Sequence, residues 1–206
     1  MFMTRLVAFG CSFTYGQSMP ICSASSRGSD AESQPSMLAW PAVLAHMMNV
    51  ECANHSTCGA SNLEILYTIL NFEFKKSDIV VIMWSLPQRD LFFKRWGTPF
   101  RQLGAWMTDR VAKKWIMSSD EYDYTQRTWM HMHHADLYLK MLDVKYIHYP
   151  AVPPRVASSL KNLTISNLYL SGQAHCDTAG DHSHPGINSH KQTAAMIFNI
   201  LNEHNT

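Results

Sequence analysis

The stretch Asp78–Ser85, DIVVIMWS, is the clearest strand signal in this chain of 206 residues. Its apolar residues follow one another without interruption, which is typical of a parallel strand covered on both faces. Three further short strands are predicted at Arg5–Phe9, Val50–Ala53 and Lys145–Tyr149. Segments with helical spacing lie between these strands. This alternation predicts a three-layer α/β/α sandwich with a flavodoxin-like, mostly parallel sheet.

The other segments are expected to surround that sheet in a single domain that spans 1–206. Apolar residues recur with helical spacing at Leu38–Met48, Asn62–Lys75 and Asn188–Glu203. The region at about 91–143 is expected to be a helical insertion with two helices, at Gly104–Met117 and Asp120–Asp143.

Two further segments are harder to assign. Ser18–Ser36 is rich in Ser, Gly, Pro and Asp, so we predict a long loop of the kind that serves as a lid or a binding loop, or else is disordered. Leu163–Leu170 is either a short edge strand or irregular.

Composition excludes several classes of function. Hydrophobic residues make up 46% of the chain, which is ordinary for a globular protein. The formal net charge is +1, with 17 basic and 16 acidic residues, so no nucleic-acid partner is expected. The apolar runs are too short to cross a bilayer, and the first residues lack the pattern of a secretory signal. We therefore expect a cytoplasmic protein without a membrane partner, and its oligomeric state is open.

Cysteine and histidine spacing argues against a metal site. The five cysteines are odd in number and form no Cys-x-x-Cys pair, so we expect reduced thiols. Two groups of possible ligands, 131–134 and 175–177, lack the usual zinc spacing, such as histidines at i and i+4 on a helix. No metal and no other cofactor is predicted.

The stretch Gly10–Gly16, GCSFTYG, follows the first predicted strand and raises a question about Ser12. Serine is a favoured helix N-cap, so its hydroxyl could simply cap the helix that begins there. Alternatively, Ser12 is a nucleophile at the carboxyl end of a strand, where ligands bind in parallel sheets. The free N–H groups of the helix would then stabilise an oxyanion beside it.

A general base for that serine is available shortly before the last predicted helix. A serine nucleophile needs an imidazole to take its proton and a carboxylate to orient the imidazole. His184, with Asp181 three residues earlier, supplies both groups from one loop. His182 and His190 are alternative bases, and Asp177 is the alternative acid.

These stretches resemble the sequence blocks of the SGNH (GDSL-type) hydrolases. GCSFTYG is similar to the GDSxTxG nucleophile block, with Cys11 at the position of the usual aspartate. Asn54–Asn62, NHSTCGASN, resembles the second block, whose glycine N–H joins the oxyanion hole and corresponds to Gly59. Gly180–Pro185 resembles the final DxxHP block, in which the acid and the base are the aspartate and histidine named above. The resemblance covers nearly the whole chain and implies the SGNH hydrolase fold.

The third block departs from the family pattern. The family has GxND after a buried strand, and the asparagine donates to the oxyanion. Here the strand leads into Trp84 and Ser85, with neither the glycine nor the asparagine. Ser85 is predicted to donate a hydrogen bond from its hydroxyl to the oxyanion instead, and Asn62 and Gln88 are the other candidates for the role of the missing asparagine. Trp84 is expected to narrow the approach and to favour a small acyl group.

The resemblance implies a serine esterase that hydrolyses a small acyl ester, such as an acetyl ester, of a carbohydrate or alcohol. Ser12 would attack the carbonyl, His184 would take its proton and Asp181 would orient the imidazole, with a hydrogen bond expected between Ser12 Oγ and His184. The N–H groups of Ser12 and Gly59 would bind the oxyanion. Two alternatives remain open: an SGNH-fold binding or structural module of low or no activity, and an acyltransferase that excludes water.

Overall fold

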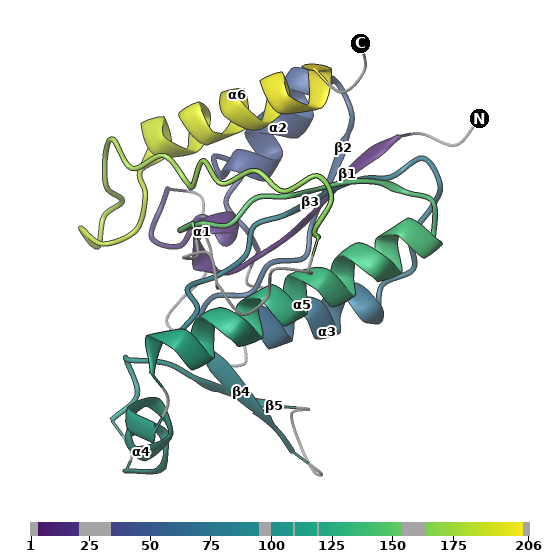
Figure 1. Ribbon diagram of the computed structural model, residues 1–206. Coiled ribbons are helices and arrows are strands. Elements are labelled where there is room, and N and C mark those ends of the chain that lie inside the picture. Colours follow the sequence, from purple (N-terminus) through teal and green to yellow (C-terminus); the bar gives the residue numbers. More distant parts are fainter. Residues whose placement is uncertain are drawn as a thin grey trace.

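Four parallel strands form the central sheet, in the order β2-β1-β3-β6 (Figure 1). The computed structural model describes residues 4–20, 34–94, 100–108, 110–118, 120–153 and 164–203. The strands are β1 (Arg5–Phe9), β2 (Glu51–Asn54), β3 (Ile79–Ile82) and β6 (Lys145–His148). The predicted mostly parallel α/β sheet is confirmed.

Helices cover both faces of this sheet (Figure 1). On one face lie α2 (Trp40–Met48) and α6 (Ile187–Glu203), and on the other lie α3 (Asn62–Leu70) and α5 (Glu121–Met141). Each face has its own apolar cluster, one built with residues of α2 and α6 and one with residues of α3 and α5. The arrangement is the predicted three-layer sandwich.

Burial on both faces explains the uninterrupted apolar strands. In β1, Val7 and Phe9 pack toward α3 and α5, whereas Leu6 and Ala8 pack toward α2 and α6. All four side chains are completely buried. Because neighbouring residues of a strand point to opposite faces, a strand with a helix layer on each side needs apolar residues at every position.

The helix α3 is shorter than the sequence pattern predicts, since it ends at Leu70 and not at Lys75. Beyond its end, Phe72 and Phe74 pack against each other and against Phe9, with ring centroids 4.8 to 5.9 Å apart. Two residues that are two positions apart would point to different sides of a helix. The aromatic cluster therefore forms only because the chain leaves the helical path.

The segment at about 91–143 is not the purely helical insertion that the sequence predicted. An antiparallel hairpin of β4 (Asp90–Phe93) and β5 (Phe100–Leu103) comes first, and α4 (Arg110–Ser118) begins six residues later than Gly104. The long helix α5 packs on α3 and leads into β6, so it belongs to the sandwich itself. Four-residue strands are too short to show a clear period of two, which is why the sequence pattern missed the hairpin.

Asp90 ties the hairpin to both helices that follow it. Its carboxylate accepts a hydrogen bond from Trp115 Nε1 of α4 at 3.2 Å and another from Arg127 Nη1 of α5 at 3.1 Å. The guanidinium of Arg127 also lies over the ring of Trp115, with Cζ 5.5 Å from the ring centroid. These contacts place the hairpin beside the sandwich.

Two sequence-based expectations concern loops. Of the predicted loop Ser18–Ser36, residues 21–33 lie outside the described residues. The segment Leu163–Leu170 is predicted to be either a short edge strand or irregular, and its residue 163 also lies outside the described residues. Within 164–170, Leu168 forms one isolated parallel bridge with His148, and no further strand continues the sheet.

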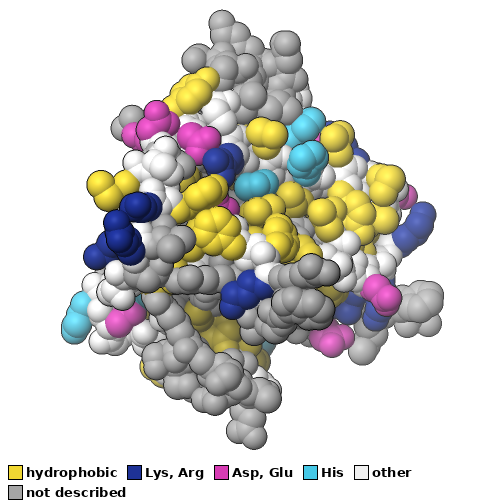
Figure 2. Space-filling model, turned by 90° about the horizontal axis from the view of Figure 1, so that it is seen from below, with side chains coloured by type: hydrophobic (Ala, Val, Ile, Leu, Met, Phe, Trp, Pro, Cys, Tyr) yellow, Lys and Arg dark blue, Asp and Glu magenta, His cyan; other side chains and the backbone are white. Residues whose placement is uncertain are grey.

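The outer surface over α3 and α5 carries many apolar side chains (Figure 2). Exposed among them are Met130, Leu137 and Met141 of α5 and Leu70 of α3. Across the described ranges of the chain, no helix is both long and apolar enough to span a membrane.

Candidate active site

Ser12 is the first residue of α1 (Ser12–Tyr15), just beyond the carboxyl end of β1. The N-cap position is taken by Cys11, whose side chain forms no capping hydrogen bond, so the N-cap interpretation of Ser12 is wrong. The serine is 2% exposed, and its buried Oγ has no hydrogen-bond partner in the part of the chain that the structure describes. A buried hydroxyl without a partner is costly, and such groups concentrate where function requires them.

The turn between β1 and α1 requires glycine at position 10. A Cβ atom on Gly10 would lie 2.0 Å from Oγ1 of Thr14 and 3.1 Å from the carbonyl oxygen of Met83. The chain can therefore turn directly from the strand into α1, and this turn places Ser12 at the edge of the sheet.

Asp181 and His184, which the sequence predicts as the acid and the base, contact each other in the structure. The Nδ1 atom of His184 lies 2.5 Å from Oδ2 of Asp181, and the backbone N–H groups of Ser183 and His184 each donate to Oδ1 at 3.0 Å. Burial acts to raise the pKa of Asp181, but these hydrogen bonds together with one from Ser18 lower it below its usual range. An ionised carboxylate only accepts, so Nδ1 carries the proton and Nε2 is left as the basic nitrogen.

The loop with His184 lies against the loop with Ser12, although the two are far apart in the sequence. The rings of Phe13 and His184 meet edge to face, with centroids 5.7 Å apart. Ser18 Oγ donates to Asp181 Oδ2 at 2.9 Å across 163 residues of chain. The structure contains no hydrogen bond between Ser12 Oγ and His184, so that predicted contact is not formed here.

The alternative acid and bases have other environments. The carboxylate of Asp177 accepts hydrogen bonds from the N–H groups of Asn188 and Ser189 at the start of α6, at 2.9 and 2.7 Å. Nδ1 of the buried His190 accepts a hydrogen bond from the N–H of Trp40 at 3.0 Å. His182 is exposed and has a positive φ of 57° within the turn. Among the described residues, Asp177, His182 and His190 form no hydrogen bond with Asp181 or His184.

Asn62 and Ser85 lie together at the carboxyl end of β3. The side chain of Asn62 accepts from the N–H of Ser85 at 2.7 Å and donates to the carbonyl of Ser85 at 3.2 Å and to Oγ1 of Thr128 at 3.1 Å. Both donors and the oxygen of this amide are thus engaged, two of the three hydrogen bonds with the backbone of Ser85 and one with the side chain of Thr128. Asn62 therefore fixes the backbone of Ser85, whereas the Ser85 hydroxyl oxygen accepts a hydrogen bond from Arg89 Nη1 at 3.1 Å.

Trp84 does not narrow the approach to the site, contrary to the expectation from the sequence. Its side chain is completely buried, and its Nε1 donates to Nδ1 of His148 in the core at 3.0 Å. Trp84 lies two residues beyond the end of β3 and continues the alternation of the strand, which turns its large ring toward the same face as Ile82, the face that α5 covers.

Gly59 lies in the loop after β2 with a positive φ of 82°. A Cβ atom there would lie 2.8 Å from Oε1 of Gln102 and 3.3 Å from the ring of Trp106, so glycine permits the close approach of the hairpin. Gln102 also donates to both oxygens of the buried Glu64, at 3.1 and 2.9 Å. Burial raises the pKa of Glu64 to about 7, although the hydrogen bond from Gln102 acts to lower it.

No pattern in the sequence predicts this polar group around Gly59, which consists of Glu64, Gln102 and Trp106. Arg89 belongs to it as well, because its guanidinium lies over the Trp106 ring, with Cζ 5.1 Å from the centroid. The contacts come from three distant segments, and no spacing in the sequence links them. One feature of the sequence could have pointed to Arg89: it lies in the same loop as Ser85, beyond the carboxyl end of β3.

No metal site emerges from the described parts of the chain. They contain no group of three or more His, Cys, Asp or Glu side chains that could hold an ion. Within the described ranges, Cys11, Cys52, Cys58 and Cys176 form no disulfide bond, and Cys22 lies outside these ranges.

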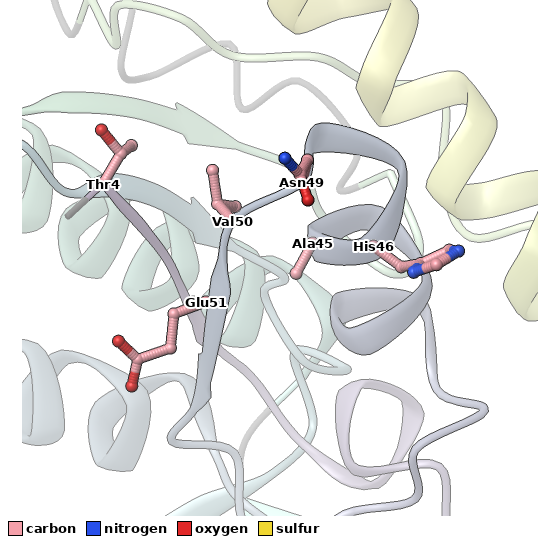
Figure 3. A pocket seen from close by; sticks show the side chains of 6 residues that line it. All are labelled: Thr4, Ala45, His46, Asn49, Val50 and Glu51. Atoms are coloured by element: carbon pink, nitrogen blue, oxygen red, sulfur yellow. The ribbon is translucent and has the colours of Figure 1, made fainter.

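A depression of about 420 Å³ lies at the opposite end of the sheet (Figure 3). It is lined by Thr4, Val50 and Glu51 at the amino ends of β1 and β2, and by residues at the end of α2. Figure 3 shows the side chains of His46 and Glu51 pointing away from each other. Its lining offers no converging polar groups, so the candidate active site remains at the carboxyl ends of the strands.

Solved structures of esterases are similar to this chain. One is a carbohydrate esterase whose active site displays divergent catalytic and non-catalytic binding functions, with a TM-score of 0.57 at 16% identity over 97% of this chain and 64% of that one. An acetyl xylan esterase from Butyrivibrio proteoclasticus matches with a TM-score of 0.57 at 11% identity, over 98% and 64% of the two chains. A G-D-S-L family protein from Desulfitobacterium hafniense DCB-2 matches with a TM-score of 0.50 at 14% identity, over 95% and 98%.

The similarity is one of structure and not of sequence. No protein-family model and no curated protein sequence matches the chain. The chain spans 64% of the length of each of the two carbohydrate esterases, and identities of 11 to 16% compare folds alone. The order of the parallel strands, the two helix layers and these neighbours agree: the chain has the fold of the SGNH (GDSL-type) esterases and lipases.

Proposed function

We propose that this protein is a serine esterase that hydrolyses a small acyl ester of a carbohydrate or alcohol. The observation that carries the proposal is the edge-to-face contact between the ring of His184, which is bound to Asp181, and the ring of Phe13. Phe13 directly follows Ser12, whose buried hydroxyl has no hydrogen-bond partner among the described residues. The fold adds support, since solved structures with the same fold include a carbohydrate esterase and an acetyl xylan esterase.

The proposed reaction begins with attack of Ser12 Oγ on the ester carbonyl. His184 Nε2 takes the hydroxyl proton and then gives it to the departing alcohol, while Asp181 stabilises the imidazolium. The oxyanion accepts hydrogen bonds from the N–H groups of Ser12 and Gly59 and from the Ser85 hydroxyl. Water activated by His184 then releases the acid and restores Ser12. Because Ser12 is 2% exposed, acylation requires the site to open around its hydroxyl.

Covalent labelling with a fluorophosphonate probe tests the proposal. The wild-type protein should be labelled at Ser12, and S12A should lose both the label and the turnover of a short-chain aryl ester. Its melting temperature should not fall below the wild-type value, because the buried hydroxyl makes no hydrogen bond with the described residues and its removal costs no such bond. Labelling of S12A at the wild-type rate, or its full turnover, would refute the assignment.

A non-catalytic binding module of the same fold is the second candidate. The absence of a Ser12–His184 hydrogen bond and the loss of the family's oxyanion asparagine favour it. This candidate predicts no labelling of Ser12 together with saturable binding of a carbohydrate. An acyltransferase, in contrast, would be labelled and would form a new ester when an acceptor alcohol is added, so analysis of the products separates it from a hydrolase.

A further inference from the structure

Ser85 is held so that its hydroxyl has one hydrogen left to donate. Arg89 Nη1 lies 3.1 Å from Ser85 Oγ, and because a guanidinium only donates, the serine oxygen is the acceptor. Asn62 binds the N–H and the carbonyl of the same residue at 2.7 and 3.2 Å. Ser85 is 2% exposed, so its position is set by these contacts and not by solvent.

The strand register brings Ser85 to the same edge of the sheet as Ser12. Phe9 of β1 pairs with Ile82 of β3, and each serine follows its paired residue by three positions. Adjacent strands lie about 4.8 Å apart. The two hydroxyl-bearing residues therefore leave neighbouring strands at the same level, next to the turn at Gly10.

Arg89 has a positive charge that is only partly compensated. Its buried Nε has no hydrogen-bond partner among the residues that the structure describes, and its Cζ lies 5.1 Å from the centroid of the Trp106 ring. The nearby buried carboxyl of Glu64 is bound by Gln102, and no ion pair joins it to Arg89 among the described residues. A guanidinium in these surroundings polarises the hydroxyl to which it donates.

We propose that Arg89 is a positioning residue of the esterase site, which holds the Ser85 hydroxyl and strengthens it as a donor to the oxyanion formed at Ser12. The proposal rests on the proposed function and extends it to a residue outside the acid–base–nucleophile set. A hydroxyl alone is a weaker donor than one whose oxygen accepts from a cation, because charge-assisted chains of hydrogen bonds strengthen one another. The pair Ser85 and Arg89 thus takes the place of a single amide donor.

The test compares R89A, R89K and S85A on a short-chain aryl ester. R89A and S85A should each lower kcat by roughly 10- to 100-fold with little change in KM, since the donor acts mainly on the transition state. The double variant S85A/R89A should lose no more than S85A alone, because Arg89 acts through Ser85. R89K should retain most of kcat, and added methylguanidinium should restore part of the activity of R89A.

R127A is the matched control, because Arg127 also lies over a tryptophan ring but binds Asp90 and not Ser85. Its kcat should equal that of the wild type. An R89A protein with wild-type kcat and a labelled Ser12 would overturn this inference and leave the proposed function standing, whereas failure to label wild-type Ser12 would refute the function itself. If R89A does not fold, S85A decides: unchanged kcat overturns the proposal.

Discussion

Two aspartates in one loop region have different roles, and this difference can be measured residue by residue. Asp181 contacts the ring of His184, whereas Asp177 accepts hydrogen bonds from backbone N–H groups that begin α6. D181N should lower kcat by roughly 10³-fold, because an amide no longer fixes the imidazole tautomer. D177N should lower the melting temperature through the weakened helix start and leave kcat within a few-fold of the wild type.

The pH dependence of stability supplies a second readout for Asp181. Its pKa is lowered in the folded protein, so its contribution is present above the ordinary pKa of an aspartate and is lost as the pH falls through the folded value. The difference in melting temperature between the wild type and D181N should therefore be largest near neutral pH and shrink in acid. If D177N, and not D181N, abolishes turnover, Asp177 and not Asp181 is the acid that orients the catalytic histidine.

At the scale of elements, one helix supplies a cap for another. The N-cap of α2, Ala39, has no side-chain cap, and the N–H of Trp40 donates instead to Nδ1 of His190 on α6. Only an unprotonated Nδ1 can accept this bond. Burial lowers the pKa of His190 to about 4, although Asp177 acts in the opposite direction.

This cap predicts a loss of stability in mild acid. Because the unfolded histidine binds a proton near its ordinary pKa of 6.5, the free energy of unfolding should rise with pH between about 4 and 6.5. The full effect is about 3 kcal/mol. H190N keeps an acceptor at the same place and does not titrate, so urea unfolding of this variant should show a smaller rise over that range. Glu64, whose pKa is raised, makes the free energy of unfolding fall with pH in the wild type and in H190N alike, so it cancels in the comparison. Identical pH profiles of the two proteins would contradict the prediction.

At the scale of the whole molecule, a buried carboxylate joins parts of the chain that no local pattern connects. Asp136 of α5 is completely buried and accepts from Tyr146 of β6 at 2.7 Å, from the N–H of Ser166 at 3.0 Å and from Lys140 at 2.8 Å. Burial acts to raise the pKa of Asp136, but its contacts with His148, Lys140 and Tyr146 lower that pKa below its usual range.

D136N should destabilise the protein by about 3 kcal/mol, because removing one charge from a buried network leaves the other groups unsatisfied. Chemical unfolding measures this loss, and Ser12 labelling below the melting temperature should remain. D143N, which removes the exposed ion pair of Asp143 with Lys76, is the control and should leave the unfolding midpoint nearly unchanged. An unchanged midpoint for D136N would show that the network adds nothing to stability.

The layers of the fold and the contact between Asp181 and His184 could both be predicted from the amino-acid sequence alone. Uninterrupted apolar strands, such as Asp78–Ser85, can only be covered on both faces, and alternating helices supply that cover. The pairing of Asp181 with His184 was also predictable, because a separation of three residues in one turn brings the two side chains together locally. Neither inference needed long-range information.

The tertiary structure decided what depends on contacts between distant segments. Packing of Phe72 and Phe74 on Phe9 ended α3 early, and the pairing of four-residue strands made the hairpin that the helical pattern concealed. The structure also turned Trp84 into the core and joined Arg89 to Ser85. The end of α3 and the partner of the buried Trp84 Nε1 are set by surfaces that lie tens of residues away in the chain. The hydrogen bond from Arg89 to Ser85 spans only four residues, but it depends on the path of the irregular loop after β3.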